Sequence, residues 1–537
     1  MSPAVESAPV LASRLDPSSG TFAADREAML AALADVDAVV DTVLAAGGPR
    51  YVDRHHERGK LTARERLDLL LDPDAPFLEI AALAGAHEPD LTTPGAGLVC
   101  GIGPVSGVDC MVIANEPTVK GGSLTPIGVT KQLRALEIAE RNRLPVIALV
   151  ESGGADLPRQ ADLFVPGGRT FRELTRLSAA GIPTIALVFG SSTAGGAYMP
   201  GMSEYTVFVR GQATVYLGGP PLVKMAINED VDDETLGGAE MHARESGLAD
   251  HLAADEYDAL RIGRRIVASL GLSPVPLRVP DAPRYTAEEL RGCAASDPKR
   301  SVEVRDVLAR VLDGSRFDEF KPLYGTTLVC GFGSLGGFPV GVLANNGILF
   351  SEESQKGAHF IQLANARSIP LLFVQNITGF MVGSAYERGG IIKDGAKLIN
   401  AVSNSTVPHL TLMVGASYGA GNYGMSGRAY DPRFVFTWPN HRIAVMGGTQ
   451  LAGVMSMVQR RSAERAGRPH DEAADAATRK AIEDGVEAQS NAIYASGRVW
   501  DDGVIDPADT RTVLSLALRA VHSAPVVGAT HFAPFRM

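Results

Sequence analysis

The stretch "IPTIALVFGSSTAGGAYMP", residues 182 to 200, joins an apolar run to an adjacent glycine pair, Gly195 and Gly196. The apolar run lacks the alternation of a half-exposed strand, so it predicts a strand buried on both faces of a sheet. Glycine costs backbone entropy, and a pair directly after a buried strand therefore needs a reason. Two explanations stay open: close packing at a tight turn, or a turn that lets a ligand atom reach bare backbone amides.

The composition is that of a large globular enzyme. The chain has 537 residues, 45% of them hydrophobic and 21% charged. Its net charge of -11 argues against nucleic acid as a main partner, because a phosphate backbone attracts a basic surface. Apolar runs fall far short of the ~20 residues that cross a bilayer, and the first residues lack the apolar core of a signal peptide. We therefore expect a cytoplasmic protein, with a flexible tail at residues 1–27 and no membrane partner.

The four cysteines contain no CxxC pair. This usage is unlike a zinc ribbon or a disulfide scaffold, so no metal is expected in this chain.

The sequence repeats itself in the same order in its two halves. "GLVCGIGPVSGVDCMVIAN" (97–115) matches "TLVCGFGSLGGFPVGVLANN" (327–346), and their cysteines, Cys100 and Cys330, are 230 residues apart. "IPTIALVFGSSTAGGAY" likewise matches "VPHLTLMVGASYGAGNY" (407–423). A repeat of this length predicts two related structural units.

Each half has the order strand, helix, strand, glycine loop, helix. Buried strands alternating with helical patterns predict an α/β fold in which helices cover a sheet. We place the N-terminal lobe at 28–285 and the C-terminal lobe at 290–530, joined by the proline-rich stretch 273–289.

The glycine loops are candidate oxyanion sites. Backbone N–H groups at a turn that opens a helix favour negatively charged oxygen, and glycine leaves them uncovered. Such donors contribute several kcal/mol in a transition state, which is enough to act without an ionisable side chain. Two related loops would suit a reaction that polarises two carbonyl oxygens.

Longer motifs then reveal a resemblance. From Tyr51 to Met537 the chain closely resembles the carboxyltransferase (β) subunit of biotin-dependent acyl-CoA carboxylases, most of all the methylcrotonyl-CoA type. The stretches that carry the resemblance are "RGKLTARERLDLLLD", "ANEPTVKGGSLTP", "ESGGADLPRQAD", "LGGPPLVKMA", "NNGILFSEESQKGAHFIQL", "QNITGFMVG", "GASYGAGNYGM" and "RVWDDGVIDPADTR".

This resemblance implies two homologous crotonase-like lobes, each a β-β-α superhelix. It places acyl-CoA in the first lobe, with the thioester oxygen on amides at Gly154 and at Gly196, beside Gly195. It places carboxybiotin in the second lobe, with the ureido oxygen on amides at Ala420 and Gly421. Four further residues would line the biotin and acyl pocket: Gly419, Gly379, Phe380 and Tyr423.

The resemblance also implies partners. An α subunit would supply biotin carboxylase and the biotin carrier of an ATP-dependent holoenzyme. Because the acyl-CoA site of one copy would face the biotin site of another, a homo-oligomer is expected, commonly a hexamer. Biotin would be both carboxyl donor and base, which suits loops without a side-chain base.

Basic residues near the first lobe's motifs could bind the CoA phosphates. Arg58, Lys60 and Lys120 are the candidates, with Arg64 and Arg66 close by in the sequence. A solvated helix face explains the same charges equally well.

The expected substrate is 3-methylcrotonyl-CoA, as in leucine breakdown. Tyr423 stands where propionyl- and acetyl-type relatives carry an Asp, which favours the methylcrotonyl type. The loop "VPGG", between Phe164 and Arg169, looks shorter than in that type. The alternative is therefore a propionyl-, acetyl- or broader acyl-CoA carboxylase β subunit.

Three other functions are compatible with parts of the sequence. "GASYG" (415–419) fits G-x-S-x-G, which would make Ser417 a hydrolase nucleophile, with His441 or His522 as its base. A crotonase-type hydratase or isomerase would need positioned Glu side chains, and the repeat offers no such pair. A non-catalytic assembly subunit would not need both glycine loops.

Overall fold

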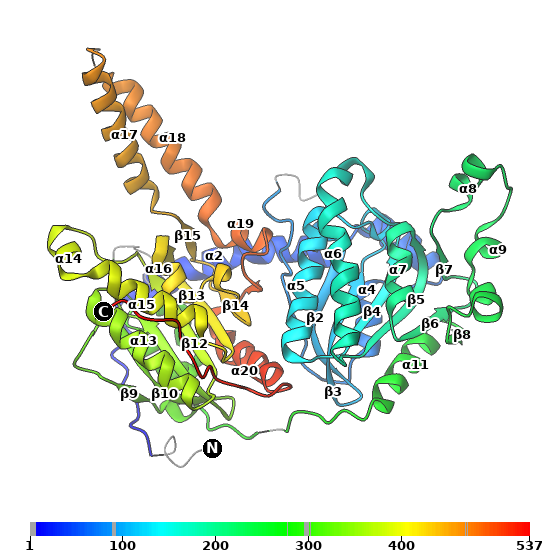
Figure 1. Cartoon of the computed structure of the whole chain (residues 1–537), viewed down its shortest axis with the longest axis horizontal. Helices are drawn as coiled ribbons and strands as arrows, with labels where there is room; N and C mark the ends of the chain where they lie inside the picture. The colour runs from blue at the N-terminus through cyan, green and yellow to red at the C-terminus, as the bar shows by residue number, and fades with distance from the viewer. Residues whose placement is uncertain are drawn as a thin grey trace.

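The computed structural model describes residues 7–88, 93–276, 278–294, 300, 302–467, 469 and 471–537. Within them, two eight-stranded sheets form the centres of two lobes (Figure 1). The first sheet has the order β1-β2-β3-β4-β5-β6-β8, and β7 pairs with β5. Its strands are β1 (Leu78–Glu79), β2 (Leu98–Val105), β3 (Val108–Asn115), β4 (Val146–Ser152), β5 (Thr184–Thr193), β6 (Tyr205–Val209), β7 (Thr214–Tyr216) and β8 (His251–Ala253).

The second sheet repeats this topology strand for strand. Its order is β9-β10-β11-β12-β13-β14-β16, with β15 paired to β13. Its strands are β9 (Asp318–Phe320), β10 (Leu328–Leu335), β11 (Phe338–Asn345), β12 (Leu371–Ile377), β13 (His409–Tyr418), β14 (Phe434–Thr437), β15 (Arg442–Ala444) and β16 (Gly503–Val504). The predicted α/β duplication is confirmed.

Local details are duplicated as well. Cys100 and Cys330 occupy the same register in the hairpins β2–β3 and β10–β11. Both lobes break register at the end of the next strand, between Val150 and Ser152 and between Gln375 and Ile377. The central strands are parallel and almost wholly buried, which explains why their sequences run apolar without alternation.

Each lobe also contains helices, most of which pack against its sheet. In the first lobe they are α3 (Pro49–Glu57), α4 (Ala63–Leu70), α5 (Pro126–Asn142), α6 (Gln160–Ala179), α7 (Tyr198–Met202), α8 (Pro220–Ile227), α9 (Asp233–Gly237), α10 (Ala239–Met241) and α11 (Glu256–Ser269). In the second they are α12 (Val304–Val311), α13 (Ser351–Ala366), α14 (Ser384–Gly389), α15 (Ile391–Asn404), α16 (Gly419–Gly424), α17 (Gly448–Arg465), α18 (Glu472–Ser490), α19 (Ala492–Gly497) and α20 (Thr510–Val521). Helices α17 and α18 form a hairpin that projects from the second lobe (Figure 1).

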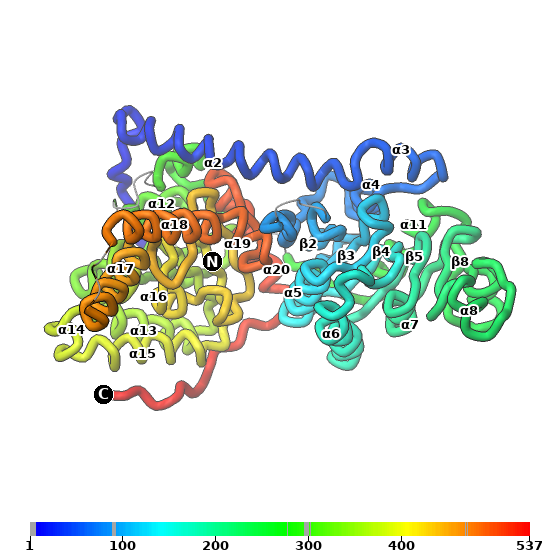
Figure 2. The backbone as a smooth tube through the Cα atoms, turned by 90° about the horizontal axis from the view of Figure 1, so that it is seen from above, coloured from blue at the N-terminus to red at the C-terminus, as the bar shows by residue number. Residues whose placement is uncertain are grey.

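The N-terminal segment differs from the expected flexible tail. Residues 1–6 lie outside the described residues, but Ser13 donates a 2.7 Å hydrogen bond to Asp306, and Val10 bridges to Arg316. Helix α2 (Gly20–Leu44), capped by Ser19, then runs from the second lobe across to the first (Figure 2). Short polar stretches give no sign of such long-range contacts, which is why the sequence indicated a tail.

The two lobes share one hydrophobic core and a buried ion pair. Met29, Leu136 and Phe436 belong to the same buried cluster. Arg134 of α5 pairs with Asp502 of the second lobe, Nε to Oδ1 at 2.8 Å, and both side chains are buried. The lobes are therefore held in a fixed relation, with their glycine turns at the ends of β5 and β13.

Within the described ranges, every helix is too short or too polar to cross a membrane. Clusters of three or more His, Cys, Asp or Glu that could hold a metal ion are likewise absent from those ranges.

Candidate active site

The first glycine turn lies directly after β5. Residues Ala194–Ala197 form a single 3-10 turn that leads into α7, and Ala194 has a positive φ of 55°. No side chain among the described residues accepts from the N–H groups of Gly195 and Gly196, which lie in the first turn of this helical segment. The Ser192 hydroxyl donates to Gly196 O at 2.9 Å, and this bond holds the turn against the end of β5. Two backbone donors are therefore presented at a surface turn.

The Gly154 turn lies against the first. Gly154 has φ +94°, and a Cβ there would lie 3.1 Å from the carbonyl oxygen of Thr193. Its own N–H donates to Ser152 Oγ at 3.2 Å, while its carbonyl accepts from Leu124 N at 2.8 Å. The structure brings Gly154 and Gly196 to the same edge of the sheet. It also gives the Gly154 amide an internal partner, which the sequence could not indicate.

The second glycine turn follows β13 and opens α16. Gly419 has φ +56°, and Gly419, Ala420 and Gly421 form the first turn of α16, whose N–H groups have no partner within the helix. A Cβ on Gly421 would lie 2.5 Å from Ile377 Cγ1 and 3.3 Å from Gly379 Cα. The two glycines therefore let β12 and α16 approach closely.

A mostly apolar cavity of about 610 Å³ opens beside this second turn. Gly419, Ala420 and the half-exposed Tyr423 line it, together with Val445 and Trp500. Phe380 lies beneath the turn instead: a Cβ on Gly424 would be 3.2 Å from its ring. Two of the four predicted pocket residues, Gly419 and Tyr423, thus line a cavity together with Ala420, while Gly379 and Phe380 support it from the adjoining strand end.

Ser417 lacks the partner that a nucleophile needs. Its hydroxyl donates to Gln375 Oε1 at 2.6 Å and accepts from Asn422 Nδ2 at 2.7 Å. His441 instead contacts Gly415 O through Nδ1 at 2.8 Å, and burial lowers its pKa to about 4. His522 contacts Leu518 O and stacks on Phe338. The hydrolase alternative has no catalytic geometry.

The predicted phosphate-binding cations divide into two groups. Arg58 and Lys120 line a second cavity of about 570 Å³, together with Arg54, His55 and Tyr51 of α3. Its wall includes Gly121, whose carbonyl accepts from Gly153 N at 3.0 Å, so the cavity adjoins the Gly154 turn.

Lys60, Arg64 and Arg66 are engaged elsewhere. Lys60 donates to Glu151 at 2.5 Å and to Phe189 O at 3.2 Å. Arg64 pairs with Glu79 at 2.8 Å, and Arg66 is fully buried in α4. The sequence placed these cations together on one helix face, but the fold turns them to different partners.

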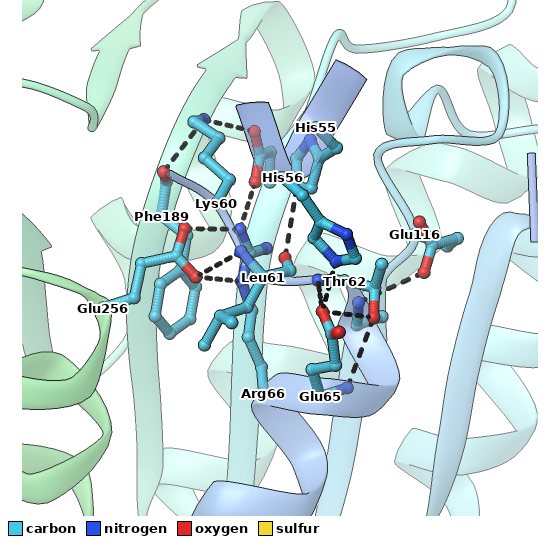
Figure 3. Close-up of polar contacts among 12 residues, drawn as sticks. His55, His56, Lys60, Leu61, Thr62, Glu65, Arg66, Glu116, Phe189 and Glu256 are labelled. Atoms are coloured by element: carbon cyan, nitrogen blue, oxygen red, sulfur yellow. Dashed lines mark hydrogen bonds and ion pairs between the residues drawn. The ribbon is translucent and has the colours of Figure 1, made fainter. Parts of the chain in front are cut away.

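Glu151 was not singled out in the sequence, although it begins the motif "ESGGA". Its carboxylate accepts from Lys60 and from Arg66, at 2.5 and 2.7 Å, and Arg66 also meets Glu256 at 2.8 Å (Figure 3). Burial opposes ionisation of Glu151, but the two cations outweigh it and lower its pKa. Gly190 is the sequence feature that reflects this network, because a Cβ at that position would overlap the Glu151 carboxylate.

The segment read as a short loop, "VPGG", is helical. Helix α6 runs through Pro166, Gly167 and Gly168 without a break. Phe164 and Val165 on this helix are highly exposed, at 83% and 78%. Proline and glycine suggested a loop because both disfavour a helix interior.

Comparison with known proteins agrees with this architecture. A model of the carboxyl transferase domain matches residues 54–533. The chain is 58% identical over 532 residues, 98% of this chain and 100% of the relative, to a probable biotin-dependent acyl-coenzyme A carboxylase beta2 subunit of Mycobacterium tuberculosis. It is 49% identical over 557 residues, 99% of this chain and 96% of the relative, to a probable mitochondrial methylcrotonoyl-CoA carboxylase beta chain of Drosophila melanogaster.

Among solved structures, the geranyl-CoA carboxylase beta subunit of P. aeruginosa superposes with a TM-score of 0.90. The two chains are 43% identical, and the match covers 98% of this chain and 100% of the other. The fold is that of a carboxyltransferase. The chain belongs to the carboxyltransferase β subunits of biotin-dependent acyl-CoA carboxylases.

Proposed function

We propose that this enzyme carboxylates 3-methylcrotonyl-CoA, using a carboxyl group delivered on biotin by a partner α subunit. The observation that carries this proposal is the pair of matching glycine turns, each of which opens a helical segment, one after β5 and one after β13. Tyr423 in the second-lobe cavity and the relatives named as methylcrotonoyl-CoA carboxylases support the choice of acyl group.

The first lobe supplies the acyl-CoA half-site. The amides at Gly195 and Gly196 would hold the thioester oxygen as negative charge develops on it. Arg58 and Lys120 would hold CoA phosphates in the neighbouring 570 Å³ cavity, as the sequence suggested. Lys60 is not expected to bind a CoA phosphate, because its ammonium group is paired with Glu151.

The second lobe fits a biotin head. Its cavity is predominantly apolar, and the amides of Gly419, Ala420 and Gly421 present donors to a ureido oxygen. When bound, carboxybiotin supplies the carboxyl group and a nitrogen base. The protein's own contribution is to orient the ring, exclude water and stabilise the oxygen.

We further propose that the working enzyme is a homo-oligomer, expected to be a hexamer, in which a first-lobe site faces a second-lobe site of another copy. Both lobes carry large apolar side chains that are exposed to solvent in the single chain, which supports an interface between copies. They are Leu157, Phe164, Val165 and Met225 in the first lobe, and Val382, Ile392 and Val445 in the second.

A substrate panel tests the proposal. The chain reconstituted with its biotin-bearing partner would be assayed with 3-methylcrotonyl-, geranyl-, propionyl- and acetyl-CoA. The highest kcat/KM is expected for 3-methylcrotonyl-CoA. Preference for a saturated thioester or for the longer geranyl chain would overturn the choice of acyl group, and size-exclusion chromatography with light scattering would test the hexamer.

A further inference from the structure

The charged network around Glu151 connects the two parts of the first-lobe site. On the backbone side, Glu151 leads directly into the turn at Gly153 and Gly154. Gly153 N donates to Gly121 O at 3.0 Å, and Leu124 N donates to Gly154 O at 2.8 Å. The turn is thus paired along its length with the segment that carries Lys120, which lines the 570 Å³ cavity.

Through its side chain, Glu151 also holds the part of the cavity wall that contains Arg58. Lys60 follows Arg58 in the loop between α3 and α4, and its ammonium group is 2.5 Å from Glu151 Oε1. Arg66 fixes α4 to Glu151 and to Glu256 at the start of α11. Glu151 therefore joins both walls of the cavity to the strand end that presents Gly154.

The duplication shows that the fold does not require these charges. Helices α4 and α12 start in the same way, since Ala63 N bonds Glu116 at 3.1 Å and Val304 N bonds Asn346 at 3.2 Å. Counting from these starts, Val307 stands where the first lobe has Arg66.

Asn376 likewise stands where the first lobe has Glu151. It lies at the matching register break, beneath Gly415 as Glu151 lies beneath Gly190. Asn376 Oδ1 accepts from Ala416 N at 3.0 Å. A neutral amide thus supports the strand end in the second lobe.

Burying a four-charge network is costly unless it is fully paired, and apolar residues often serve packing as well. Its presence in one lobe only calls for a role specific to that lobe. We propose that Glu151 is a positioning residue that couples the CoA-phosphate cavity to the Gly154 turn. This inference rests on the proposed acyl-CoA half-site in the first lobe.

The coupling has a physical consequence. Binding energy from the remote, non-reacting end of a substrate can be used to orient the reacting end. With the network intact, phosphates held at Arg58 and Lys120 fix the walls that hold the turn. Without it, the nucleotide end still binds, but it no longer orders the thioester site.

The experiment compares two thioesters of 3-methylcrotonic acid, one of CoA and one of pantetheine, which lacks the nucleotide. Wild type, Glu151→Gln and Lys60→Met would each be assayed as the complex with the biotin-bearing partner. We expect the wild-type kcat advantage of the CoA thioester to fall about tenfold in both variants, because small misplacements of a turn reduce kcat strongly. The KM of the CoA thioester should change little.

Glu79→Gln is the matched control. It breaks the Arg64 ion pair on the same helix α4 but lies outside the network, so the CoA advantage should persist. If Glu151→Gln fails to fold, Lys60→Met decides alone, since its side chain is partly exposed.

An equal loss with both thioesters, or no loss, would overturn the inference and leave a structural role only. A wild-type complex that carboxylates neither thioester would instead refute the proposed function, and the inference would fall with it.

Discussion

Gly421 packs against Ile377 so closely that a Cβ on the glycine would lie 2.5 Å from Ile377 Cγ1. Gly196, at the related turn of the first lobe, is different: the nearest atom to its added Cβ would be Ser192 Oγ at 3.5 Å. One glycine is thus required by packing, whereas the other has free space around it. This contrast decides which substitutions can separate function from folding.

Gly196→Val should abolish carboxyl transfer while the protein still folds. The side chain would occupy open space at the turn where the thioester oxygen is expected. Loss of an oxyanion site lowers kcat by about 10²–10³-fold. Steady-state kinetics with the CoA thioester and a thermal melt would be measured together. Near-full activity would show that the hole is misplaced.

Ala420→Val tests the second turn in the same way. Ala420 is exposed and lines the 610 Å³ cavity, so a larger side chain should be accommodated by the fold. Carboxyl transfer should fall about a hundredfold, while equilibrium binding of acyl-CoA stays unchanged. Gly421→Ala serves as the comparison, because it should unfold the turn and destabilise the protein. A normal rate for Ala420→Val would remove this turn from the proposed site.

Arg58→Met combined with Lys120→Met should raise the KM of the CoA thioester about a hundredfold or more. The pantetheine thioester should be unaffected, because it carries no nucleotide phosphates. Charge-assisted hydrogen bonds to phosphate contribute roughly 1.5–3 kcal/mol each, which sets the expected size. Kinetics at two salt concentrations would check the electrostatic origin. An unchanged KM would place the phosphates elsewhere.

Patterns within short stretches predicted much of this molecule. Unbroken apolar runs gave the buried strands, and the repeat located two related turns, because both signals are local. Contacts between distant segments were not predictable in this way. Lys60 was predicted to bind phosphate because its partner, Glu151, is 91 residues away and no local pattern connects the two.

The prediction of a flexible tail at residues 1–27 missed the contacts made before Gly20 for the same reason. Ser13 bonds Asp306, which lies 293 residues further along the chain. The cavity wall made by Arg54, His55 and Tyr51 also depends on how α3 packs beside Lys120. No periodicity within either segment records such a neighbour.

Fluorophosphonate reagents should not label Ser417. Its hydroxyl is buried between Gln375 and Asn422, and no histidine among the described residues contacts it. Mass spectrometry of the intact chain after treatment would measure labelling, with a serine hydrolase as positive control. A single adduct that disappears in Ser417→Ala would revive the hydrolase alternative.

Stability should fall as the pH drops below about 6.5, because two histidines are buried in the neutral form. Burial lowers the pKa of His441 to about 4 and that of His409 to about 3. The unfolded chain binds protons at these sites near pH 6.5 and the folded chain does not, so stability present above that pH is lost between about 6.5 and 4.

His441→Gln keeps a donor for Gly415 O and removes one titrating group. Denaturant unfolding from pH 7.5 to 4.5 should then show a slope shallower by about 1.4 kcal/mol per pH unit. Parallel curves for the variant and the wild type would mean that His441 is already protonated in the folded protein.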